Sequence, residues 1–174
     1  MNRQDIEREV NSLLKKHSIT EAPVPVEHIA TEEGIPIIET TYDGEVSGAL
    51  IRANGVVGIA VNSAHHPNRR RFTIAHELAH FMLSHEGEHV DWNFTVLRRD
   101  NRSSEASDSV EIEANAYAAC LLMPRDFLLH DLRIDFSGQF DLSEEHLAAI
   151  ARKYKVSTTA LNYRLINLGL LSPV

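Results

Sequence analysis

Hydrophobic positions recur with helical spacing in several separate stretches of the chain. From Asp5 to about Lys16, apolar residues return every three or four positions among charged ones, which predicts an amphipathic helix that packs one face on the rest of the protein. Comparable patterns with capping residues predict helices over residues 26–33, 110–122, 143–154 and 157–168, and a short one ending near residue 132. Residues 67–84 are apolar on most of their circumference, and this predicts a buried helix.

Three short runs between the first helices have the composition of β-strands. They cover residues 35–38, 46–52 and 56–61. Pro36 cannot donate a hydrogen bond to a neighbouring strand, so the first run is predicted to be an edge strand. Asn54 and Gly55 separate the other two runs, and an Asn-Gly pair in this place is a strong hairpin signal. We therefore expect an α+β fold with a small antiparallel sheet of about three strands packed on helices.

The polar stretch over residues 85–109 divides the predicted helices into two groups. It contains Gly87, two adjacent arginines and a serine-rich patch, which favours a long mobile loop with one short strand near residues 94–97. A loop of this length is a place where a gate over a functional site could lie. No internal repeat and no long linker is found in the sequence.

Composition narrows the possible classes of function. The 174 residues include 17 Lys and Arg against 25 Asp and Glu, a net charge of -8, which disfavours nucleic acid as the main partner. No apolar run is long enough to span a membrane, and the single Cys120 cannot form an internal disulfide. We therefore expect a cytoplasmic protein with no membrane partner. Ten histidines are the feature that calls for a chemical explanation.

The motif His76-Glu77-Leu78-Ala79-His80 lies inside the predicted buried helix. At 100° per residue, His76 and His80 lie about 40° apart on one helix face, which allows both imidazoles to reach one zinc ion. Glu77 is offset by one position, so its carboxylate can act as a general base beside the metal. The spacing predicts His76 and His80 as metal ligands and Glu77 as the catalytic residue.

A catalytic zinc site usually has a third protein ligand. Glu86 falls where another zinc-peptidase pattern has its last ligand, but Leu83 replaces the glycine that would turn the chain back, so we discount it. The helix over 110–122 offers Glu111 and Glu113, which point to different helix faces. Helical periodicity alone leaves the choice between these two glutamates open.

Two motifs together resemble a known family. They are the run from Arg71 to His80 and the run from Glu111 to Pro124, EIEANAYAACLLMP, and the sequence is similar to the ImmA/IrrE family of zinc metallo-endopeptidases. The family's second motif places its zinc-binding glutamate on Glu111, and the sequence departs from that motif only in having Tyr117 where phenylalanine is usual. The resemblance implies a gluzincin-like peptidase domain over 1–132 and a C-terminal helical element over 133–174.

The same resemblance implies a cytosolic protease whose substrate is often a helix-turn-helix repressor encoded beside it. Some relatives are stress-response activators or components of toxin-antitoxin systems. Zn²⁺ is the implied cofactor, with His76, His80 and Glu111 as its ligands. The sequence itself does not name the repressor or its cleavage site.

A binding module is the alternative class of function. The segment from Leu147 to Leu168 has the rhythm of a helix-turn-helix, and positive charge comes from residues Arg152, Lys153, Lys155 and Arg164. It could bind DNA or dock on a regulator, with the metal site serving a structural or regulatory purpose. The apolar stripe of Leu161, Leu165 and Leu168 favours packing of this segment on the protein body instead.

Overall fold

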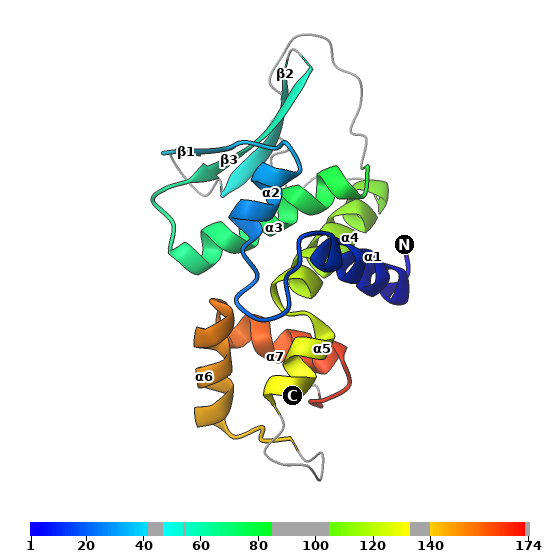
Figure 1. The fold of residues 1–174 in the computed structure, drawn as a ribbon, viewed down its shortest axis with the longest axis vertical. Coiled ribbons are helices and arrows are strands. Elements are labelled where there is room, and N and C mark those ends of the chain that lie inside the picture. The colour runs from blue at the N-terminus through cyan, green and yellow to red at the C-terminus, as the bar shows by residue number, and fades with distance from the viewer. Residues whose placement is uncertain (42–46, 54, 85–104, 133–139, 173–174) are drawn as a thin grey trace. The chain divides into compact units, whose positions relative to one another are not determined.

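A computed structural model describes residues 1–41, 47–53, 55–84, 105–132 and 140–172 (Figure 1). The elements in these ranges are α1 (Arg3–Lys16), α2 (Val26–Glu32), β1 (Ile37–Thr40), β2 (Gly48–Ala53), β3 (Val56–Asn62), α3 (Pro67–Met82), α4 (Glu105–Leu122), α5 (Arg125–Asp131), α6 (Glu144–Tyr154) and α7 (Thr158–Asn167). The mixed α+β class and the predicted helices are confirmed. None of the described helices is long and apolar enough to cross a membrane.

Helix α4 begins earlier than the sequence predicts. The polar serine-rich residues suggested a loop up to residue 109, whereas the helix starts at Glu105. Serine and acidic residues are tolerated in a first helical turn, where backbone N–H groups lack intrahelical partners, so their polarity did not mark a loop there. The strand expected near 94–97 and the expected gate lie outside the described residues.

Contacts within the chain define two compact units, residues 25–118 and residues 1–24 together with 119–174. Helix α4 contributes residues to both. The boundary at residue 132 that the family resemblance implies stays a prediction.

The sheet of the unit formed by residues 25–118 has the strand order β1-β3-β2. Strands β2 and β3 form the predicted antiparallel hairpin, but β1 pairs with β3 in parallel, so the expectation of a wholly antiparallel sheet was wrong. The physical reason lies in β3, whose residues from Gly58 to Asn62 are consecutively buried, as in a central strand covered on both faces. Both of its edges must be paired, and β1 takes the edge that the hairpin leaves.

The edge position predicted for β1 is confirmed. Pro36 precedes the strand, and its carbonyl accepts the backbone N–H of Ile59 at 2.9 Å although it has no N–H to donate. Helix α3 runs along the sheet, with α2 against it (Figure 1). Ile74 and Leu78 of α3 are 4% and 0% exposed, which anchors one side of this helix in the core.

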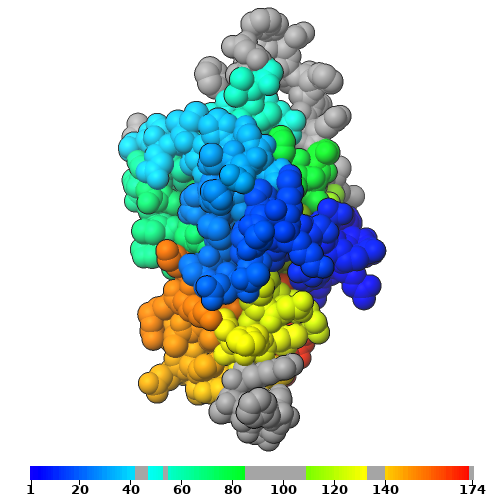
Figure 2. Space-filling view, in the orientation of Figure 1, coloured from blue at the N-terminus to red at the C-terminus, as the bar shows by residue number. Residues whose placement is uncertain are grey.

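The unit that holds the C-terminus contains α1, the end of α4, and α5 to α7. Helix α6 ends at Lys155 in a left-handed conformation, and Ser157 then caps α7 by accepting the N–H of Ala160 at 3.1 Å. Two helices joined by a short turn are therefore present, as predicted, and α6 forms part of the surface in Figure 2 (orange). Leu161 and Leu165 of α7 are buried, in agreement with the packing expected of this stripe.

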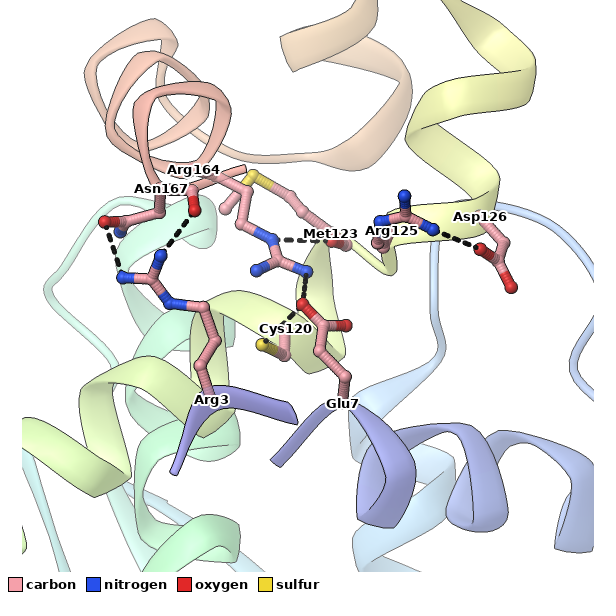
Figure 3. A network of polar contacts seen from close by, with 8 residues as sticks. All are labelled: Arg3, Glu7, Cys120, Met123, Arg125, Asp126, Arg164 and Asn167. Atoms are coloured by element: carbon pink, nitrogen blue, oxygen red, sulfur yellow. Dashed lines mark hydrogen bonds and ion pairs between the residues drawn. The ribbon is translucent and has the colours of Figure 1, made fainter. Parts of the chain in front are cut away.

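Arg164 does not supply the surface charge that we expected from it. Its side chain is 2% exposed, and its Nη2 lies 2.7 Å from Oε1 of Glu7 (Figure 3). Its Nε donates to the carbonyl of Met123 at 3.0 Å. The sequence suggested a free cation because Arg164 follows other basic residues, but its partner lies on α1 at the opposite end of the chain. Arg164 joins α7 to α1 and to the end of α4.

Candidate metal centre

Helices α3 and α4 bring His76, His80 and Glu111 together within the unit of residues 25–118. One turn of α3 separates the two histidines, so their Nε2 atoms lie only 3.1 Å apart. Oε2 of Glu111 lies 3.2 Å from Nε2 of His76, and Oε1 lies 3.4 Å from Nε2 of His80. The three side chains therefore direct their ligand atoms at one point.

The donor set fits a tetrahedral zinc ion. Ligand atoms about 2.0 to 2.2 Å from a tetrahedral metal lie about 3.3 to 3.6 Å from one another. The two Nε2 atoms lie 3.1 Å apart, and each lies 3.2 or 3.4 Å from a different oxygen of Glu111, all within about 0.2 Å of that range. Two imidazoles and one carboxylate, without cysteine, form the set found in catalytic zinc sites, where three protein ligands leave one position open. The same set could also accept other transition metals.

Only one of the two glutamates that the sequence left open belongs to this cluster. Among the described residues, the group that could hold a metal contains Glu111 and does not contain Glu113. Hydrogen bonds with His76 and His80 hold the pKa of the Glu111 carboxyl well below its usual range, so it is ionised as a ligand must be. Glu86, which we discounted, lies outside the described residues.

Glu77 lies beside the cluster and is 7% exposed. Its Oε2 is buried and has no hydrogen-bond partner among the described residues, while the backbone N–H of Leu50 donates to the carboxylate. Burial raises the pKa of Glu77 above its usual value, and the neighbouring histidines oppose that shift. A buried carboxylate with one oxygen unpaired suits a base that awaits a proton donor.

Phe72 is a neighbour of the cluster that the sequence analysis did not single out. Its ring stacks on His76 with the centroids 6.3 Å apart and an interplanar angle of 29°. The sequence feature that could have predicted this contact is the i, i+4 spacing, which places Phe72 and His76 on one helix face. The sequence also contains His85 and His89 shortly after this helix, and both lie outside the described residues.

Comparisons with known proteins agree with the geometry. The family described as the IrrE N-terminal-like domain matches residues 30–166. The chain is 33% identical over 107 residues to the radiation response metalloprotease IrrE of Deinococcus deserti, covering 62% of this chain and 35% of that protein. The corresponding protein of Deinococcus radiodurans is 28% identical over 107 residues, covering 62% and 30%. The chain thus spans about a third of the length of these relatives.

A solved structure, a transcriptional regulator of Mycobacterium tuberculosis, has a similar fold. It superposes with a TM-score of 0.57 at 18% identity, over 93% of this chain and 46% of the regulator. At this identity the likeness concerns the fold alone. Because the family match extends over most of the chain, the resemblance found in the two sequence motifs is confirmed, and the protein belongs to the ImmA/IrrE family.

Proposed function

We propose that the protein is a zinc-dependent endopeptidase that cleaves a protein partner in the cytoplasm. The observation that carries the proposal is the convergence of His76, His80 and Glu111 beside the buried carboxylate of Glu77, whose Oε2 has no hydrogen-bond partner among the described residues. A structural zinc site is normally closed by four protein ligands, often cysteines. This cluster has three ligands and a base, which is the composition of a hydrolytic site.

The residues of the site have separate roles in peptide hydrolysis. The two imidazoles and the Glu111 carboxylate would hold the metal, which when bound lowers the pKa of a coordinated water and polarises the carbonyl to be attacked. Glu77 accepts the proton of the attacking water at Oε2, to which none of the described residues donates a hydrogen bond. Burial favours the protonated form of Glu77 that results, so the same carboxyl can pass the proton to the leaving amine nitrogen.

The substrate we propose is a helix-turn-helix repressor or antitoxin encoded beside the protein. The net charge of -8 suits a partner with a basic surface, such as a DNA-binding protein. Among the described residues, strand β2 pairs with β3 alone, so its other edge could align an extended peptide by adding it to the sheet. A role in transcription regulation or in a toxin-antitoxin pair would follow from such a substrate.

The test is incubation of the purified protein with the repressor from the adjacent reading frame, followed by mass spectrometry of the products. We expect cleavage by the zinc-loaded protein and no cleavage by the Glu77→Gln variant, which keeps the metal ligands. Glu113→Gln is the matched control and should cleave like wild type, because Glu113 is not in the cluster. Unchanged cleavage after removal of the metal by a chelator would refute the proposal.

The Glu77→Gln variant, together with neutralisation of exposed cations, also tests the binding-module alternative. A function of α6 and α7 in DNA binding should survive Glu77→Gln and be lost when the exposed cations Arg152, Lys153 and Lys155 are neutralised. The burial of Arg164 removes one of the four cations on which that alternative depended.

A further inference from the structure

Strand β2 and helix α3 lie side by side with matched spacing. A Cβ atom on Gly48 would lie 2.5 Å from Cγ2 of Thr73, and the N–H of Leu50 reaches the carboxylate of Glu77. Two residues of a strand and four residues of a helix both advance by about 6 to 7 Å. The pairs Gly48 with Thr73 and Leu50 with Glu77 are therefore successive contacts between one strand and one helix face.

The next residues along both elements also border one space. Arg52 and Phe81 follow Leu50 and Glu77 by two and four residues, and both line a hollow of about 340 Å³. Strand β2 and helix α3 thus remain neighbours beyond the contact of Leu50 with Glu77.

The hydrogen-bond pattern of the sheet shows which way the Leu50 amide points. Asn62 donates its N–H to the carbonyl of Ser47 at 2.9 Å, and alternate residues of an antiparallel strand face the same side. The backbone groups of Ala49 and Ile51 therefore face β3, while those of Leu50 point to the outer edge of β2. Ile59, which stands opposite Leu50, agrees with this assignment because it donates to Pro36 on the far side of β3.

We propose that the backbone N–H of Leu50 is a positioning group, which holds one carboxylate oxygen of Glu77 so that the other, Oε2, faces the attacking water. The proposal rests on the proposed peptidase function. It gives the outward-facing amide of Leu50 an acceptor on Glu77, whose Oε2 has no hydrogen-bond partner in the part of the chain that the structure describes. A carboxylate fixed at one oxygen loses the rotation that would otherwise turn Oε2 away from the substrate.

Gly48 makes the alignment possible. A Cβ atom there would lie 2.5 Å from the carbonyl oxygen of Ala60 as well as from Thr73, closer than such atoms can approach. A side chain at position 48 would therefore displace the start of β2 and carry Leu50 away from Glu77.

The first experiment measures amide hydrogen exchange by NMR in the zinc-loaded protein. We expect Glu77→Ala to speed exchange of the Leu50 amide by about ten- to a hundredfold, the equivalent of losing one hydrogen bond to a charged acceptor. The ladder amides of Ala49 and Ile51 should keep their rates, which shows that the sheet is intact. Glu77→Gln retains an acceptor oxygen and should preserve most of the protection. A Leu50 exchange rate that is the same in wild type and Glu77→Ala would overturn the proposal.

The second experiment removes only the amide hydrogen, by replacing Leu50 with its α-hydroxy acid so that the backbone carries an ester. The substrate is an internally quenched fluorescent peptide that contains the bond cleaved by wild type. With this substrate we expect kcat to fall about tenfold or more, with little change in KM or zinc content. The same replacement at Ile37 is the control, since its amide faces the opposite sheet edge and its ester likewise weakens one ladder acceptor, Pro36. It should leave kcat unchanged.

The two experiments separate failure of this inference from failure of the proposed function. An active wild-type enzyme whose Leu50 ester keeps its full kcat would contradict the positioning role alone. A wild-type protein that cleaves nothing would contradict the peptidase proposal, and the exchange rates of the Leu50 amide would still decide whether this amide holds Glu77.

Discussion

Replacement of Arg164 by methionine should destabilise the protein far more than loss of any surface cation. Arg164 is buried in the unit that holds the C-terminus, where it binds Glu7 through Nη2 at 2.7 Å and the carbonyl of Met123 through Nε at 3.0 Å (Figure 3). Methionine has a similar length and can fill most of the space, so the substitution mainly removes these two polar contacts.

The magnitude follows from what the substitution leaves behind. Loss of one partner from a buried ion pair typically costs about 3 to 5 kcal/mol, because the remaining charge stays desolvated. Glu7 has a side chain 17% exposed and can recover some hydration, so the lower part of that range applies, about 3 kcal/mol. For a chain of this size each kcal/mol shifts Tm by about 2 to 4 °C, and we expect a decrease of about 6 to 12 °C.

Urea unfolding followed by circular dichroism would measure the change in free energy of unfolding. Arg152→Met is the matched control: Arg152 is exposed on α6, and its loss should change stability by no more than about 0.5 kcal/mol. Combining Arg164→Met with Glu7→Gln should recover part of the loss, since no unpaired charge then remains. Arg164→Met with a stability equal to that of Arg152→Met would refute the reasoning.

Three further outcomes follow from the same unit of the structure. Tyr154→Phe removes a 2.8 Å hydrogen bond to the carboxylate of Asp131 and should cost about 1.5 to 3 kcal/mol in urea unfolding, whereas Tyr163→Phe, at a position 66% exposed, should cost almost nothing. Although burial opposes the shift, hydrogen bonds from Lys153 and Tyr154 keep the pKa of Asp131 below its usual value. The contribution of Asp131 to stability is therefore present at neutral pH and is lost as the pH falls below about 4. Asp131→Asn should flatten the plot of stability against pH in that range, and identical plots for the variant and wild type would contradict this. Burial raises the pKa of Cys120 to about 12, so Ellman's reagent should label this thiol only after denaturation, and rapid labelling of the native protein would show that it is accessible.

The sequence predicted those features of the candidate metal cluster that depend on local geometry. His76 and His80 belong to one helix, and the fixed advance of 100° per residue is enough to place them together. The choice of Glu111 over Glu113 depends on how α4 approaches α3, which helical periodicity cannot supply. The family resemblance pointed to Glu111, and the distances to the two imidazoles agree with it.

Long-range pairing was the part that the sequence could not predict. The parallel pairing of β1 with β3 depends on which edge of the central strand is left by the hairpin, and the pattern of β1 contains nothing that selects it. Arg164 appeared to be a surface cation because Glu7, the partner that buries it, is 157 residues away along the chain. The amide of Leu50 has no side-chain signature at all, so its contact with Glu77 becomes visible only in the structure.

Titration of zinc into the metal-free protein by calorimetry tests the central claim most directly. We expect about one zinc per chain in wild type and in Glu113→Gln, and an affinity at least about tenfold weaker in Glu111→Gln. Equal zinc affinity in all three proteins, or loss of binding in Glu113→Gln alone, would contradict a metal centre built from His76, His80 and Glu111.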